Sequence, residues 1–198
     1  MSAMHRLFVA LDMPAAVNDS LIALCQGVSG AKWADSGPFH LTLRFIGDAD
    51  DGLLQEIQYA LAKIEAPAFD LALKGVGYFP PRGPAKILWA GIEDAPLLLH
   101  LRGQVAAMFE AIGLEPERRK FAPHITLARF KRGPAAARVG EFLASHALFR
   151  TEPFPITQFH LYSSRLRLGG ALHRIEASYP LRDAAAMWSA LEMDELDA

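Results

Sequence analysis

The sequence has very little cysteine and no long hydrophobic run. Cys25 is the only cysteine in 198 residues, so the chain can form neither an internal disulfide framework nor a cluster of thiolate metal ligands. No apolar run approaches the roughly 20 residues that a membrane-spanning helix needs. The opening MSAMHRLFVALDM lacks the long apolar segment and small-residue cleavage site of a secretory signal. These absences predict a cytoplasmic protein.

The chain also lacks an excess of basic residues. Its 20 Lys and Arg stand against 22 Asp and Glu, which gives a net charge of −2. Proteins that coat nucleic acid usually carry a basic excess, so this balance argues against that class and leaves only a localised basic patch open. With 52% hydrophobic and 21% charged residues, the composition is that of a globular protein long enough to bury one sizeable core.

Strand-like and helix-like segments are mixed along the chain. Alternating apolar residues predict strands, and apolar residues spaced three and four apart predict amphipathic helices. The expected strands cover residues 6–12, 39–47, 69–79, 85–92, 123–130, 154–164 and 171–179, with a short extended segment at 31–35. The expected helices cover residues 15–28, 51–66, 96–113 and 135–147.

The order of these segments predicts an α+β fold with two similar lobes. In each half of the chain, a strand that contains His-x-Thr is followed by a helix and then by two strand-like segments. Two such lobes would place their sheets on either side of a central cleft, with helices outside. We expect residues 1–182 to form a single bilobal domain, and residues 183–198 to form a C-terminal helix or acidic tail.

The two His-x-Thr triplets are the most informative motif. The chain has only 7 histidines, yet FHLTLRF near residue 40 is echoed by PHITLARF near residue 124. Side chains alternate across a strand, so His40 and Thr42 share one face, while Leu41, Leu43 and Phe45 share the other. The same parity groups His124 with Thr126. Each strand therefore has an apolar face for a core and a polar face that meets water or a ligand.

Two imidazoles and two hydroxyls suit acid–base displacement at phosphorus. One imidazole can deprotonate a water while the other protonates the leaving oxygen, and Thr hydroxyls can donate to the non-bridging oxygens. This chemistry requires no metal or cofactor. The segment RRKFAPHITLARFKR adds six basic residues without an acid. Its Arg129 suits bidentate phosphate binding, although its strand parity is opposite to that of His124.

Several segments carry a resemblance to a known family. LFVALDMP, KWADSGPFHLTLRFIGD, AKILWAGI, FAPHITLAR and FHLYSSRLRLGGALHRIEASYPL follow one another in the expected order. They resemble the 2H phosphoesterase superfamily, and within it the bacterial RNA 2′,3′-cyclic phosphodiesterases, which are also called 2′-5′ RNA ligase-like or LigT-like proteins. The resemblance implies two pseudo-symmetric lobes with antiparallel sheets that face a central cleft.

The resemblance also implies an activity and a set of site residues. The expected reaction is metal-free hydrolysis of a terminal 2′,3′-cyclic phosphate to a 2′-phosphomonoester, with 2′-5′ RNA ligation as a reverse or side activity. His40 and His124 would be the acid–base pair, and the phosphate would be held by Thr42, Thr126 and Arg129. The division of roles stays open; our working hypothesis makes His124 the base and His40 the acid. His173 stands where relatives often carry Tyr.

Other interpretations remain open at this point. The two histidines could bind zinc, although neither motif has a carboxylate or Cys at ligand spacing. The chain could also be a non-catalytic protein that binds RNA ends or cyclic nucleotides. The substrate could be a tRNA half, a longer RNA, a mononucleotide or an ADP-ribose cyclic phosphate, and we expect a monomer. His160 and His173 are further candidates to line the cleft. Three aromatic residues could stack on a base, although we expect them in the core: Trp33, Trp89 and Phe45.

Overall fold

The structure is a computed structural model, and it describes residues 4–34, 38–167 and 170–183. Apart from Asp183, the segment 183–198 that was predicted as a helix or tail lies outside these residues. The strands are β1 (His5–Asp12), β2 (Lys32–Trp33), β3 (His40–Ala49), β4 (Phe69–Leu71), β5 (Leu73–Phe79), β6 (Ile87–Ile92), β7 (His124–Arg129), β8 (Phe154–Ile156), β9 (Gln158–Arg167) and β10 (Gly170–Pro180). The helices are α1 (Ala15–Leu24), α2 (Asp51–Leu61), α3 (Pro96–Ala111) and α4 (Ala136–Ser145).

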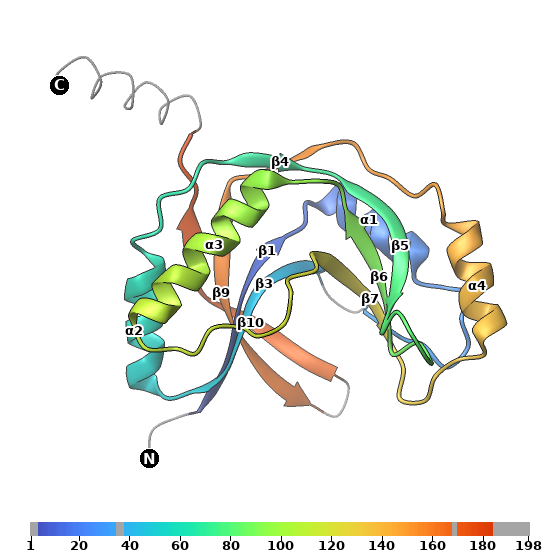
Figure 1. Ribbon diagram of the computed structural model, residues 1–198, viewed down its shortest axis with the longest axis horizontal. Helices are drawn as coiled ribbons and strands as arrows, with labels where there is room; N and C mark the ends of the chain where they lie inside the picture. Colours follow the sequence, from blue (N-terminus) through green and yellow to red (C-terminus); the bar gives the residue numbers. More distant parts are fainter. Residues whose placement is uncertain (1–3, 35–37, 168–169, 184–198) are drawn as a thin grey trace.

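The main sheet divides into two parts that meet at one residue pair. Its strand order is β10-β9-β1-β3-β7-β6-β5, with β2 beside β7, and its strand pairings are antiparallel. β3 and β7 share only the pair Leu41–Ile125. We call β10, β9, β1 and β3 the first lobe, and β7, β6, β5 and β2 the second lobe (Figure 1). The predicted α+β class with two antiparallel lobes is confirmed.

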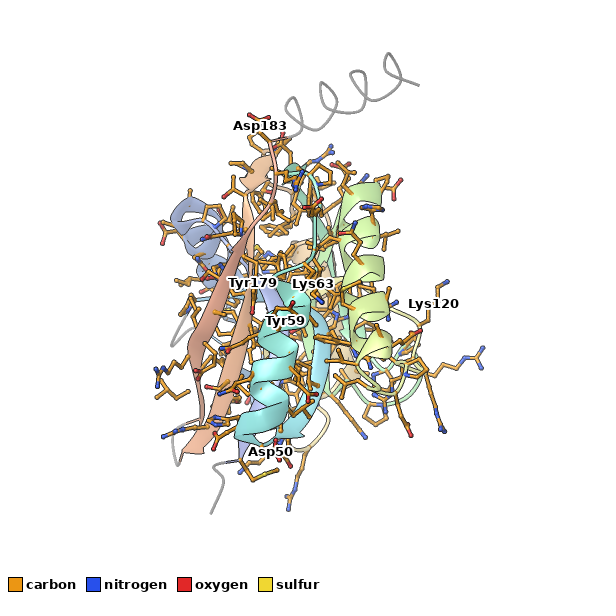
Figure 2. All side chains as sticks on the ribbon, turned by 90° about the vertical axis from the view of Figure 1, so that its left-hand side faces the viewer. Asp50, Tyr59, Lys63, Lys120, Tyr179 and Asp183 are labelled. Carbon is orange, nitrogen blue, oxygen red and sulfur yellow. The ribbon has the colours of Figure 1, made fainter. Side chains whose placement is uncertain are left out.

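The helices cover the outer faces of the lobes. α2 and α3 contact each other and β3, and Figure 2 shows them side by side on the first lobe. On the second lobe, α4 meets β2 through the rings of Trp33 and Phe142, whose centroids are 6.0 Å apart. The end of α1 approaches β7, where the Cys25 thiol donates to the Leu127 carbonyl at 3.9 Å. None of the residues that line the cleft belongs to a described helix.

The lobes do not follow the two halves of the chain. The first lobe takes β1 and β3 from the start and β9 and β10 from the end, whereas β5, β6 and β7 of the second lobe lie between them. The repeated strand–helix order in the sequence suggested one lobe per half. Antiparallel pairing of distant segments produces the observed exchange, because β1 pairs with both β3 and β9.

The core lies between the sheet and the helices. β1 is buried on both faces: Leu7, Val9 and Leu11 belong to this core, and Phe8 on the opposite face belongs to a small second cluster. The buried side of α2 follows helical spacing, and its start is capped by Asp50, which accepts a hydrogen bond from the Leu53 amide at 2.9 Å. Among the described helices, none is long and apolar enough to cross a membrane.

Candidate active site

Both His-x-Thr motifs begin a strand, and the two strands are neighbours. β3 starts at His40 and β7 starts at His124. Leu41 pairs with Ile125 in antiparallel orientation, and both side chains are fully buried. Because side chains alternate across a strand, the His and Thr of each motif lie on the opposite face, toward the cleft.

The antiparallel pairing also determines which groups lie near each other. β3 and β7 run in opposite directions from their shared pair, so His40 lies toward Thr126 and Thr42 lies toward His124. All four side chains, and that of Arg129, line one cleft of about 890 Å³. Ligand sites typically enclose roughly 300–1,000 Å³. The five residues selected from the sequence are therefore brought together in a cleft of suitable size.

Arg129 reaches the cleft because β7 contains a bulge. Two adjacent residues of β6 pair with Thr126 and Ala128, so Leu127 is an extra residue in β7. A bulge interrupts the alternation of side chains, and Leu127 and Ala128 are both fully buried. The alternation resumes one residue later, which turns Arg129 toward the cleft. Simple alternation would place Arg129 on the face opposite to His124, and this inserted residue explains why it reaches the cleft instead.

β3 contains the same bulge at the equivalent place. Adjacent residues of β1 pair with Thr42 and Arg44, so Leu43 is the extra residue. Leu43 and Arg44 are buried, whereas Phe45 is 61% exposed and lines the cleft. The prediction that Phe45 lies in the core on the same face as Leu43 is therefore wrong. The cause is the bulge, which reverses the alternation after Leu43.

The His40 imidazole is surrounded by rings. Its centroid lies 5.1 Å from that of Phe8 and 5.2 Å from that of His173. Burial and then the charge of His173 lower the pKa of His40 to about 4. Asp12 lies opposite His40 in the backbone pairing of β1 and β3. Its carboxylate raises the pKa of His40, and so does a backbone hydrogen bond at Pro38. Without an anionic ligand, His40 is therefore neutral at pH 7.

The His124 imidazole has a defined tautomer. Its Nδ1 lies 2.7 Å from the Ala122 carbonyl oxygen, which can only accept, so Nδ1 carries a proton and the neutral ring keeps a lone pair on Nε2. The ring of Phe79 packs edge-on against the imidazole at 5.0 Å and closes one side. Burial lowers the pKa of His124, the bond to Ala122 opposes this, and the charge of Arg129 lowers the pKa further. Arg129 thus acts on both imidazoles.

Only part of the basic cluster faces the cleft. Of the six basic residues between 118 and 132, three line it: Arg119, Lys120 and Arg129. The other three are exposed but do not line the cleft: Arg118, Lys131 and Arg132. The localised basic patch that the composition left open is therefore present at the cleft, and it is smaller than the sequence cluster.

The sequence matches the family model of the 2′-5′ RNA ligase superfamily over residues 15–167. The chain belongs to this superfamily. The match spans both His-x-Thr motifs and Arg129, and it agrees with the resemblance to 2H phosphoesterases that the sequence carries.

Individual relatives are similar over half of the chain or more. An RNA 2′,3′-cyclic phosphodiesterase of Thermus thermophilus is 33% identical over 188 residues, which cover 89% of this chain and 90% of that protein. One of Aeropyrum pernix is 37% identical over 101 residues, 50% of this chain and only 57% of that protein. The crystal structure of TT0787 of Thermus thermophilus has a TM-score of 0.75 and 28% identity, and the match covers 90% of this chain and 99% of that one.

In this member of the superfamily, His40 is backed by a polar cluster that the sequence analysis missed. The Tyr162 hydroxyl donates to the Asp12 carboxylate, and the other carboxylate oxygen lies 3.7 Å from Nε2 of His160. Nδ1 of His160 is 2.8 Å from the Ser178 hydroxyl. These residues lie on β1, β9 and β10, so only the register of distant strands assembles them. The one local signal was an acid at the end of the first strand.

Of the remaining candidate residues, some line the cleft and others do not. His173 lines the cleft on β10, whereas His160 is 3% exposed and lies in the polar cluster behind it. Trp33 packs against α4, and Trp89 packs against Phe79 at 5.4 Å. In residues 4–34, 38–167 and 170–183, no three His, Cys, Asp or Glu side chains are grouped as a metal site.

Proposed function

We propose that this chain is an RNA 2′,3′-cyclic phosphodiesterase that opens terminal 2′,3′-cyclic phosphates to 2′-phosphomonoesters without a metal ion. This proposal rests mainly on the pair of His-x-Thr strands, which lie antiparallel at one cleft, and on Arg129, which a bulge turns toward the same cleft. The names of the similar proteins from Thermus thermophilus and Aeropyrum pernix support the same reaction. The substrate is an RNA end or a small cyclic nucleotide, and the protein acts as a cytoplasmic monomer.

The two histidines divide the proton transfers. His124 accepts a proton from water on Nε2, because its Nδ1–H is bound to the Ala122 carbonyl. The water oxygen bonds to phosphorus, the bond between phosphorus and O3′ breaks, and His40 donates its proton to O3′. The product carries the phosphate on O2′. His124 then releases its added proton to solvent and His40 takes one up, which restores both imidazoles.

Two features of the surroundings of His40 favour the acid role. Asp12 and the backbone at Pro38 favour its protonated form, whereas burial and the neighbouring positive charges disfavour it. An anionic phosphate beside the ring counteracts the unfavourable effects, so His40 gains its proton when substrate binds. No carboxylate contributes in this way to His124. This difference supports the working assignment of His40 as acid and His124 as base.

Three side chains stabilise the charge on the phosphate. The hydroxyls of Thr42 and Thr126 and the guanidinium of Arg129 line the same cleft as the imidazoles. They donate to the non-bridging oxygens, where negative charge increases as the fifth bond to phosphorus forms. The same site would join RNA ends if a 5′-hydroxyl replaced water as the attacking group, since release of O3′ then leaves a 2′-5′ phosphodiester.

The deciding experiment is an assay in EDTA. The purified protein is incubated with an oligoribonucleotide that ends in a 2′,3′-cyclic phosphate, and the product is identified by mass and by phosphatase sensitivity. We expect opening to a 2′-phosphate. Opening that requires an added metal ion, or release of a 3′-phosphate, would contradict the proposed mechanism. Retention of the oligonucleotide without turnover would support the non-catalytic binding protein instead.

A further inference from the structure

A third imidazole lies in the cleft beside His40. His173 of β10 lines the cleft, and its ring centroid is 5.2 Å from that of His40, with an angle of 79° between the two ring planes. Phe8 contacts both imidazoles: its centroid is 5.1 Å from that of His40 and 5.0 Å from that of His173. The three rings therefore form one cluster, and both of its imidazoles line the same cleft.

The register of three strands places His173 in this position. His173 pairs with Ser164 of β9, and Ser164 pairs with Arg6 of β1. Paired residues lie on the same face of a sheet, and these three all line the cleft. Phe8 lies two residues after Arg6 and so shares this face. His173 thus reaches the cluster from β10, the strand at the end of the main sheet.

His173 is more accessible to water than His40. His173 is exposed, whereas His40 is half-buried, and burial is the main cause of the lowered pKa of His40. Burial also lowers the pKa of His173, so both rings are mainly neutral at pH 7 without a ligand. His124 instead packs against Phe79, a ring that cannot carry a proton. His40 therefore has a more exposed neighbour that can take up and release protons near neutral pH.

The charges around the pair disfavour two protons on it. Two imidazolium ions at this separation repel each other, and the charge of His173 accordingly lowers the pKa of His40. Asp12 favours a proton on His40, whereas Arg129 disfavours it. The other charged or titratable groups at the pair or along the cleft are Arg6 on β1, Tyr162 on β9, and Arg119 and Lys120 before β7. The pair is therefore suited to carry one proton at a time.

We propose that His173 relays protons from solvent to His40, so that the two imidazoles hold a single proton between them. The relay rests on the proposed function, because His40 must regain a proton after it has protonated O3′. A solvent or buffer acid gives a proton to the free ring nitrogen of neutral His173, and the other nitrogen passes its proton to the lone pair of His40. His173 is then neutral in the other tautomer, and exchange with solvent restores the first.

The kinetic test replaces His173 with two side chains that cannot titrate. His173→Phe keeps a ring in the cluster and His173→Gln keeps a polar group, so the two variants have only the loss of the relay in common. The substrate is cytidine 2′,3′-cyclic phosphate in dilute buffer with EDTA. We expect kcat to fall about tenfold in both variants with little change in KM. Added imidazole should restore most of the loss, because it can carry the proton in place of the side chain.

The matched control is His100→Phe. His100 is exposed on α3 and does not line the cleft, so this variant should show neither the loss nor the restoration. A loss in only one of the two His173 variants would point to packing or hydrogen bonding and would overturn the relay. A loss that imidazole does not restore, or a kcat near wild type in both variants, would also overturn it.

The shared proton is tested by nuclear magnetic resonance titration of the histidine ring signals, which does not depend on turnover. The signals of His40 and His173 are assigned by their loss in His40→Gln and His173→Phe. Removal of the neighbouring charge should raise the pKa of His40 by about 0.5 to 2 pH units in both His173 variants. The pKa of His40 should not change in His100→Phe. An unchanged pKa of His40 in either His173 variant would reject the shared proton.

Failure of the relay and failure of the proposed function are distinguishable. Turnover by the wild-type protein with unchanged kcat in both His173 variants rejects the relay and leaves the phosphodiesterase activity standing. If the wild-type protein opens neither this substrate nor an oligoribonucleotide with a 2′,3′-cyclic phosphate end, the proposed function fails. The pair is then judged by the titration alone: a raised pKa of His40 supports the shared proton, and an unchanged pKa rejects it.

Discussion

The strands β3 and β7 share a backbone design but differ in the side chain that follows the bulge. Each begins with His-x-Thr, each inserts one residue after the Thr, and each then returns a side chain to the cleft. In β7 that side chain is Arg129, and in β3 it is Phe45. The comparison indicates that pseudo-symmetry places the paired imidazoles and hydroxyls at the cleft, while a different residue at one equivalent position makes the two ends of the cleft unlike each other.

The two imidazoles also differ in the groups that surround them. His40 pairs with Asp12 across β1 and β3 and contacts the rings of Phe8 and His173. His124 instead binds a backbone carbonyl and contacts Phe79. These unequal surroundings fit the proposed division of acid and base roles between the two imidazoles.

The largest expected effect comes from removing either imidazole. His40→Ala and His124→Ala should each lower kcat by about 10²- to 10⁴-fold, because each removes one proton transfer. Binding of an RNA with a 2′-phosphate end should change much less. His100→Ala, on the exposed side of α3, is the matched control. Near wild-type turnover in either cleft variant would end the two-histidine mechanism.

Loss of the guanidinium should have the next largest effect. Arg129→Gln should lower kcat about 100-fold, since the removed donor acts on charge that develops in the transition state. Arg129→Lys should recover part of the loss, because it restores the charge without the bidentate geometry. Measured kcat and KM would show whether Arg129 acts on the reaction step or on substrate binding. A change confined to KM in Arg129→Gln would contradict a role in the reaction step.

The two hydroxyls should contribute less, and about equally. Thr42→Val and Thr126→Val keep the shape of the side chain and should each lower kcat/KM about tenfold, the value expected for one lost hydrogen bond to a charged oxygen. Thr157→Val, an exposed position outside the cleft, serves as control. A loss in only one of the two variants would show that the phosphate is held asymmetrically.

The smallest expected change at neutral pH comes from Asp12→Asn. Asp12 raises the pKa of His40, so its replacement should lower that pKa further, while His173 and Arg129 continue to disfavour the charged ring. We expect a bell-shaped pH profile of kcat/KM whose alkaline limb moves to lower pH in the variant, because the acid loses its proton earlier.

The limb that moves identifies the role of His40. A shift of the acidic limb instead would make His40 the base and reverse the assignment. Glu176→Gln is the control: this carboxylate accepts a hydrogen bond from Ser163 and does not contribute to the pKa of His40. Equal shifts in both variants would indicate a general charge effect rather than a specific one.

The sequence predicted local features well and long-range ones poorly. The four helices expected within residues 15–147, most strands and the two polar motif faces follow from hydrophobic periodicity, and the structure contains them. The strands expected at 69–79 and 154–164 are each divided into two, and the helix or tail expected at 183–198 lies outside the described residues apart from Asp183. Phe45 was misplaced because LTLRF reads as unbroken alternation, and only the pairing with β1 reveals the extra residue. The cluster of Asp12, Tyr162 and His160 depends in the same way on the register of β1 with β9.

The exchange of strands between the lobes has a consequence for dissecting the protein. β5, β6 and β7 of one lobe lie in the chain between β3 and β9 of the other. A cut in the connection from α3 to β7 would therefore yield two fragments that each contain strands of both lobes and one of the two motif histidines. Neither fragment could form half of the cleft alone. Activity would return only on reassociation, which makes this connection a natural place to divide the chain into a complementation reporter.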